Sequence, residues 1–219
     1  YYLLINKMEI TVYTDGACTR NGQAGAKAGL GVYFSENDPR NCSERIEGKQ
    51  TNNRAELLAI LKAVEILYQE ILAGYKIHIY SDSTYAIRCC GEYGQKLHEK
   101  NWESKKPIPN LQLVKLAFYT FQQHKNVEFH YIAAHTGLDD INSRGNEGAD
   151  RMANLAIGQT ECSYANKVKK IYLKLPYEEK EDGKKLGAKW DPKKKKWYVT
   201  SNINKTNLEI ILSRWSNNN

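Results

Sequence analysis

Three short segments near the start of the chain alternate between apolar and polar residues. They cover residues 9–14, 29–34 and 43–49, and short loops that contain Gly, Asn or Pro join them. Alternation with a period of two is typical of strands that bury one face. The pattern therefore predicts an antiparallel meander of three strands at the start of a sheet.

The spacing becomes helical after residue 50. Residues 51–72, TNNRAELLAILKAVEILYQEIL, carry apolar side chains three and four positions apart, which predicts one long amphipathic helix. Thr51, Asn52 or Asn53 is suited to cap its start. The apolar positions of this helix are Leu57, Leu58, Ile60, Leu61, Val64, Leu67 and Ile71.

Strands and helices alternate in the next part of the chain. We predict strands over residues 76–80 and 127–133, and helices over residues 83–90, 111–123 and 146–157. Such alternation favours parallel strands, because a parallel connection needs a crossover that is usually helical. The expected fold class is α/β, with a five-stranded mixed sheet flanked by helices.

The periodic pattern is interrupted by the polar residues 159–167, which we interpret as a linker. The predicted organisation is a body at residues 1–158 and a small α+β domain at residues 168–219. About fifty residues is close to the lower limit for a self-sufficient core. The elements predicted in the small domain are strands over 168–175 and 196–200 and helices over 178–186 and 206–215.

The positive charge of the chain is concentrated in its last quarter. The 219 residues are 41% hydrophobic and carry a formal net charge of +7. Residues 1–165 contain 18 Lys+Arg and 19 Asp+Glu, whereas residues 166–219 contain 14 and 6. A basic segment beside a near-neutral body suggests an accessory that binds a polyanion. A solvated lysine-rich surface is the alternative.

The five cysteines form no recognisable framework. Their number is odd, and no Cys-X-X-Cys pair occurs. We therefore expect a reducing, intracellular location, the cytoplasm or, in a eukaryote, the nucleus. No apolar run is as long as a membrane span, so we expect no membrane association.

Four acids lie where the carboxyl ends of strands or the starts of helices are predicted. Asp15 is expected to end the first strand, Glu56 lies in the first turn of the long helix, Asp82 follows a strand, and Asp150 lies on the first turns of a later helix. Converging carboxylates repel one another unless cations lie between them, and Mg²⁺ prefers oxygen ligands. Taken singly, each acid could instead be a turn, capping or helix-dipole residue.

Five segments in this order and spacing resemble type 1 ribonuclease H: YTDGAC, TNNRAELLAI, YSDSTYAI, AAHTG and GNEGADRMA. The resemblance covers roughly residues 9–157. It implies the RNase H-like fold and an enzyme that cuts the RNA strand of an RNA–DNA hybrid, leaving 5′-phosphate and 3′-OH ends. By resemblance, two Mg²⁺ ions, or Mn²⁺, are held by Asp15, Glu56, Asp82 and Asp150. His135 matches a loop histidine that assists product release or proton transfer.

The resemblance also implies contacts to both strands of the hybrid. RNA is distinguished by its 2′-OH, which small polar groups can contact in the wide minor groove. In proteins of this family, the position that Arg20 occupies here usually holds a smaller polar residue. The RNA-strand candidates are Gly16, Cys18, Asn21, Asn52 and Asn53; the DNA-strand candidates are Lys49, Thr51, Tyr85, Tyr93, Trp102 and Asn110.

Two segments need a separate interpretation. Residues 94–107 resemble a basic protrusion that contacts hybrid phosphates, although Trp102 could simply pack in its core. The segment between His135 and Asp150 is longer than in short relatives, and we interpret Asp139 and Asp140 there as solvated. His78 and His130, inside predicted strands, are interpreted as structural.

Aromatic and lysine residues interleave in the basic tail. The pattern is similar to a small uncharacterised module of nucleic-acid enzymes and, distantly, to a hybrid-binding domain. Stacking on bases and neutralisation of phosphates would serve such a role. A protein-interaction module is the rival interpretation, and Trp190 and Trp197 could form the core of the domain. The candidate contacts are Lys189, Trp190, Lys195, Lys196, Trp197 and Tyr198.

Other hypotheses remain open at this point. A nuclease of related fold could act on another substrate such as a DNA junction, although the Asn52–Asn53 pair before Glu56 argues against it. A catalytically silent hybrid-binding protein, or a detached domain of a reverse transcriptase, is a third hypothesis, and the presence of all four acids argues against silence. For the enzyme we expect a monomer that acts on an RNA–DNA hybrid and requires no protein partner.

Overall fold

The computed structural model describes residues 8–134, 140–159, 170–200 and 203–215. The chain divides into two compact units, Tyr1–Cys162 and Ser163–Asn219. Within these described ranges, no helix has the length and apolar character needed to cross a membrane.

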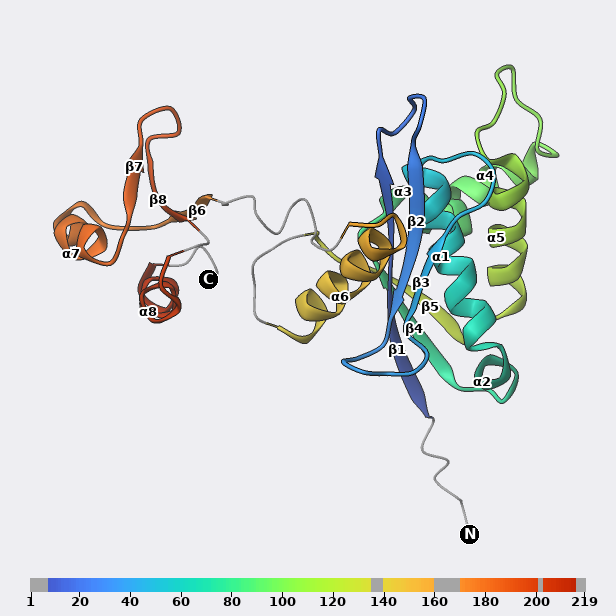
Figure 1. Ribbon diagram of the computed structural model, residues 1–219, viewed down its shortest axis with the longest axis horizontal. Helices are drawn as coiled ribbons and strands as arrows, with labels where there is room; N and C mark the ends of the chain where they lie inside the picture. Colours follow the sequence, from blue (N-terminus) through green and yellow to red (C-terminus); the bar gives the residue numbers. More distant parts are fainter. Residues whose placement is uncertain (1–7, 135–139, 160–169, 201–202, 216–219) are drawn as a thin grey trace, which may run out of the picture. The chain divides into compact units, whose positions relative to one another are not determined.

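The first unit is built on a five-stranded mixed sheet with the order β3-β2-β1-β4-β5 (Figure 1). Strands β1, β2 and β3 are antiparallel neighbours, while β4 is parallel to both β1 and β5. The predicted meander followed by parallel strands is therefore confirmed. The strands are β1 Glu9–Thr19, β2 Lys27–Tyr33, β3 Cys42–Arg45, β4 Lys76–Ser81 and β5 Val127–Tyr131.

Helices cover both faces of this sheet (Figure 1). Helix α1 packs on β1 and β2 from one side, together with α3 and α5, and α6 packs on β1, β2 and β3 from the other. The helices are α1 Asn52–Ile66, α2 Tyr68–Leu72, α3 Thr84–Cys90, α4 Glu92–Glu99, α5 Leu111–Gln123 and α6 Ile141–Ala156.

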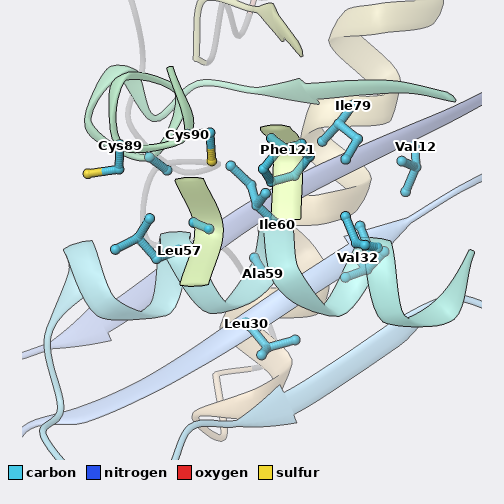
Figure 2. Packing of buried hydrophobic residues seen from close by; sticks show 14 of the residues in the cluster. Val12, Leu30, Val32, Leu57, Ala59, Ile60, Ile79, Cys89, Cys90 and Phe121 are labelled. Atoms are coloured by element: carbon cyan, nitrogen blue, oxygen red, sulfur yellow. The ribbon is translucent and has the colours of Figure 1, made fainter. Parts of the chain in front are cut away.

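The main core lies between the sheet and α1. Leu57 and Ile60 of α1 are fully buried against Val12, Val32 and other sheet residues (Figure 2). Cys89 and Cys90 are buried in the same core as free thiols. Burial of these apolar side chains of α1 stabilises its packing against β1.

Several element boundaries differ from those predicted. The long helix of residues 51–72 is interrupted at Leu67, where α1 ends and α2 begins. Residues 92–99, over which no helix was predicted, form α4. Helix α6 begins at Ile141 rather than residue 146, because Asp140 caps it by accepting hydrogen bonds from the backbone of Asn142 and Ser143. Asp140 is thus a capping residue and not simply a solvated one.

The second unit contains a three-stranded antiparallel sheet with the order β6-β8-β7 and two α-helices. The short strand β7 was not predicted. One face of the sheet packs with α8 in a small core that includes Val199, Ile211 and Trp215. The elements are β6 Lys170–Leu173, a 3₁₀ turn Tyr177–Glu179, α7 Lys180–Lys185, β7 Lys189–Asp191, β8 Lys196–Thr200 and α8 Lys205–Trp215.

Candidate functional site: a carboxylate cluster

The central strand pair positions two of the four acids. The parallel pairing of β1 with β4 ends at Thr14 and Ser81, and Asp15 and Asp82 follow directly. Asp15 does not end its strand as predicted, because β1 continues to Thr19 through its antiparallel pairing with β2. The Asp15–Gly16 pair is therefore not a turn; it lies where one neighbour of β1 stops and the other continues.

Gly16 brings Glu56 beside Asp15. A Cβ atom at Gly16 would overlap the backbone nitrogen of Glu56 and the carbonyl carbon of Ala55. Only glycine therefore allows the first turns of α1 to lie this close to β1. The space that a side chain at Gly16 would need is filled by α1, and contact of the Gly16 backbone with the hybrid stays a prediction.

Three carboxylates converge at this point. Oxygen atoms of Asp15, Glu56 and Asp82 all lie within 4.8 Å of one another. Asp15 and Glu56 are 7% and 5% exposed, so two of these acids are almost fully removed from water. Asp150 comes to the same cluster from the third turn of α6, rather than from its first turns, and contributes to the electrostatics of Asp15.

The burial of like charges perturbs the protonation of the cluster. Desolvation raises the pKa of Asp15 well above its ordinary value, and the charges of Asp82 and Asp150 raise it further. Desolvation also raises the pKa of Glu56, with added repulsion from Asp15 and Asp82. The apo cluster thus favours bound protons, or cations in their place.

The donor set fits a divalent metal. Glu56 Oε2 is buried and has no hydrogen-bond partner among the described residues. An unpartnered oxygen of a carboxylate clustered with two other carboxylates is costly unless a cation neutralises it. Oxygen ligands of this kind are those that hard cations such as Mg²⁺ prefer.

Amide side chains hold the acids in place. Asn52 Nδ2 donates to Glu56 Oε1 over 3.2 Å, and Asn21 Oδ1 accepts from the backbone N–H of Asn52 over 3.2 Å. On α6, Asn154 Nδ2 donates to Asp150 Oδ1 over 2.9 Å. Asn52 and Glu56 both lie on α1, and Asn154 and Asp150 both lie on α6. These hydrogen bonds therefore hold each acid against its own helix.

Asn146 was missed by the sequence interpretation, although it lies within the GNEGADRMA segment. Its Nδ2 donates to Asp82 Oδ2 over 3.3 Å, and the side chain is 2% exposed. Asn146, Asp150 and Asn154 succeed one another at intervals of four, so they share one buried face of α6. That spacing of polar residues on a buried face is the signal that could have identified Asn146.

The RNA-strand candidates surround the cluster only in part. Asn21 and Asn52 are hydrogen-bonded to each other at its edge, and Asn53 is exposed on the outer side of α1. Cys18 is half-buried, and its thiol lies 3.7 Å from the carbonyl oxygen of Gln50. Arg20 has a φ of 50°, a left-handed conformation at the end of β1.

The DNA-strand candidates lie around the starts of α1, α3 and α5. Asn110 has a φ of 54° before α5, and its Nδ2 donates to the Tyr85 hydroxyl over 3.4 Å. Thr51 is the N-cap residue of α1, with no hydrogen bond from its side chain to the helix backbone. Lys49 is exposed, and Tyr93 packs partly against the main core.

Trp102 is engaged in packing, as its alternative interpretation held. Its Nε1 donates to the Tyr119 hydroxyl over 3.1 Å, and its ring packs edge-on against Phe118. Lys115 Nζ lies 5.4 Å from the ring centroid. His135 and Asp139 lie outside the described residues.

The candidate nucleic-acid contacts of the second unit lie on two different faces of its sheet. Tyr198 pairs with Tyr172 across β8 and β6, and Lys170 Nζ lies 4.3 Å above the Tyr198 ring. Trp197 instead packs partly against the small core, with Trp190, 48% exposed, edge-on against it. Lys189, Lys195 and Lys196 are exposed.

Comparisons with known proteins agree with the site. Residues 7–157 match the RNase H family, and residues 170–216 match a Domain of unknown function (DUF5710). Ribonuclease H of Schizosaccharomyces pombe is 37% identical over 65% of this chain and 50% of its own length, and human Ribonuclease H1 is 33% identical over 69% and 51%. This chain thus spans about half the length of those relatives. Ribonuclease H of Ruthia magnifica, also 33% identical, is covered over 95% of its length.

Solved structures show the same fold in the first unit. The PFV RNase H domain superposes with a TM-score of 0.53 at 18% identity, over 68% of this chain and 93% of that domain. The foamy viral protease-reverse transcriptase in complex with RNA/DNA hybrid gives 0.55 at 17%, over 68% and 20%. With the family match covering well over half of its residues, this chain belongs to the RNase H family.

Proposed function

We propose that this protein is a divalent-metal-dependent endonuclease that hydrolyses the RNA strand of RNA–DNA hybrids. The observation that carries the proposal is the convergence of Asp15, Glu56 and Asp82 in a member of the RNase H family. Several acids packed into a largely buried cluster cost stability, and a metal site explains why the fold brings them together.

In this proposal Asp15, Glu56, Asp82 and Asp150 hold two Mg²⁺ ions. When bound, the two ions supply activation of the attacking water and stabilisation of the leaving oxygen. Asn52 and Asn146 orient the Glu56 and Asp82 carboxylates through the hydrogen bonds described above. In the reaction, a water oxygen bonds to phosphorus as the bond to the 3′-oxygen breaks, which yields a 5′-phosphate and, after proton transfer, a 3′-OH.

Recognition of RNA is assigned to the groups beside Glu56. Asn21 and Asn52 present amide groups at the edge of the cluster, where a 2′-hydroxyl can donate and accept hydrogen bonds. A DNA strand lacks that hydroxyl and would leave these polar groups unpaired, which disfavours its binding at the cutting position. A foamy viral relative in fold was solved with an RNA/DNA hybrid, which agrees with this substrate class.

Cleavage of labelled duplexes tests the proposal. We expect Mg²⁺-dependent cutting of the RNA strand in a hybrid, with no cutting of double-stranded RNA or DNA and none in EDTA. Asp82→Asn is expected to lower the rate by at least about 10³-fold, because it removes one charge from the metal-binding set. Undiminished cutting by Asp82→Asn, or equal cutting of double-stranded RNA, would contradict the proposal.

We also propose that the second unit strengthens binding of the hybrid. The support is its excess of lysine and the sheet face on which Lys170 and Lys194 lie over the rings of Tyr198 and Tyr172. Lysines neutralise phosphates and aromatic rings stack on bases, and a tethered second site raises the effective concentration of substrate. Asp191 accepts hydrogen bonds from Lys170 and Tyr172 and so orders this face.

A further inference from the structure

A second cluster of potential metal ligands lies on β4 and β5, away from the acids. His78 on β4 is directly opposite Glu128 on β5, and His130 follows two positions later on the same face. His78 lies four residues before Asp82, roughly 13 Å along an extended strand. The side chains of His78, His130 and Glu128 are 15%, 33% and 45% exposed, so the cluster is accessible to solvent.

One ligand atom of each side chain lies in the same small volume, where the two imidazoles are hydrogen-bonded to each other. His78 Nδ1 lies 2.9 Å from His130 Nε2, and Glu128 Oε2 lies 3.6 Å from the first and 3.9 Å from the second. In a tetrahedral site with bonds of about 2.0–2.1 Å, neighbouring ligand atoms are roughly 3.3 Å apart. The three observed separations bracket that value, so small side-chain movements would suffice to form such a site.

The surrounding groups orient these ligands. Glu9 Oε2 lies 3.4 Å from the other ring nitrogen of His78, Nε2. A carboxylate at this position favours the proton on Nε2 and leaves the Nδ1 lone pair for a metal, as carboxylate–histidine–metal sites do. The His130 ring is stacked on Tyr80 with centroids 4.7 Å apart, which restricts its rotation.

We propose that His78, His130 and Glu128 bind a first-row transition metal ion, with Zn²⁺ the best match. Two imidazoles and one carboxylate form a nitrogen-rich set that suits Zn²⁺, whereas Mg²⁺ prefers oxygen ligands. A water molecule would complete the coordination. The ion would link the edge strand β5 to β4 and so stabilise this side of the sheet. Asp82 follows directly after β4.

Lys76 is the group that opposes binding. Its Nζ lies 3.1 Å from Glu128 Oε1, whereas Oε2 is the carboxylate oxygen near the two imidazoles. The ion pair leaves Oε2 for the metal but places a positive charge beside the site. Lys76→Gln is therefore expected to strengthen Zn²⁺ binding, whereas Glu9→Gln is expected to weaken it by about 10-fold or more.

Nitrogen-detected NMR of the histidine rings, with Mg²⁺ in excess, tests the site on the full chain. One equivalent of Zn²⁺ is expected to shift His78 Nδ1 and His130 Nε2 and to leave the rings of His98 and His124 unchanged. Because the acid cluster offers only oxygen ligands, Zn²⁺ bound there would not produce these nitrogen shifts. Unchanged His78 and His130 signals would overturn the proposal.

Competition with a chromophoric chelator then measures affinity in matched variants. His130→Gln and the more exposed Glu128→Gln are each expected to weaken Zn²⁺ binding at least about 10-fold. His124→Gln is the control, because His124 contacts Tyr68 outside the cluster, and its affinity is expected to equal that of the wild type. Equal affinity in wild type and Glu128→Gln would exclude the three-ligand site even if His130→Gln failed to fold.

Discussion

At the scale of single residues, protonation of the Asp15 carboxyl group links the stability of the fold to the binding of cations. Its folded-state pKa is raised well above the ordinary value of 3.8, first by burial and then by Asp82 and Asp150. The folded protein therefore holds this proton to a higher pH than the unfolded chain does. Without metal, this group favours folding at low pH, and that contribution is lost as pH rises from the unfolded pKa through the folded one.

Asp15→Asn removes this titration. In EDTA we expect the variant to gain stability relative to wild type as pH rises above about 4, because only the wild type must then bury a charged Asp15 carboxylate. Saturating Mg²⁺ is expected to reverse the difference, because the cation offsets the repulsion only in wild type. Urea unfolding at several pH values measures both effects. A difference independent of pH would show that Asp15 does not titrate in this way.

Asn146 is a positioning residue that contacts Asp82 and is almost fully buried. We expect Asn146→Ala to lower kcat by roughly 10-fold, about 1.4 kcal/mol of the barrier, and to raise the Mg²⁺ concentration needed for half-maximal rate. The KM for the hybrid is expected to change little, because the side chain orients a carboxylate and does not bind substrate. Glu147→Gln, on the exposed side of the same turn, is the control. An increase in KM with unchanged kcat would contradict this role.

At the scale of elements, the close approach of α1 to β1 at Gly16 sets the distance between Asp15 and Glu56. Gly16→Ala would push the start of α1 from the strand, because the added Cβ meets backbone and not a flexible side chain. We expect a loss of roughly 1–3 kcal/mol in stability and at least a 10-fold loss in cleavage rate. Denaturation and kinetics measure the two losses. Full activity in a folded Gly16→Ala protein would show that this close contact does not position Glu56.

The sequence predicted elements where periodicity was strong and missed boundaries set by single contacts. The apolar stripe of α1 and the alternation of β4 were sufficient to place both elements. The start of α6 depends on a capping contact of Asp140, and the continuation of β1 beyond Asp15 depends on its pairing with β2. Such contacts involve polar residues without periodicity, so hydrophobic spacing could not reveal them.

Much of the site was predictable for a different reason. The four acids were recognisable as a set from their motifs, and three of them converge within one small volume. The role of Gly16 in the packing of α1 was not predictable, because it depends on how closely two elements distant in sequence approach. The contact of Asn146 with Asp82 likewise depends on the register of α6 on the sheet.

At the scale of the whole molecule, charge is divided between a near-neutral first unit and a basic second unit. If the second unit binds the hybrid, its lysines release counterions from the phosphates, and affinity falls with salt in proportion to the contacts made. Lys195 lies in the exposed turn before β8, and Lys196 is the exposed first residue of β8, two positions before Tyr198. They are the lysines whose removal should change salt dependence without affecting the carboxylate cluster.

We expect the double variant Lys195→Gln, Lys196→Gln to bind hybrid more weakly and to reduce the slope of log K against log salt by up to about 2. The matched control is Lys184→Gln, Lys185→Gln, which also removes two charges, but from lysines paired with Glu181 and Asp182 on α7. Binding is measured in EDTA from 50 to 200 mM salt. Equal slopes for the two variants would assign the effect to net charge, and an unchanged slope in both would leave the basic unit without a role in hybrid binding. A smaller slope only in the first variant would place phosphate contacts at the turn before β8 and at the start of β8, because the two proteins have the same total charge.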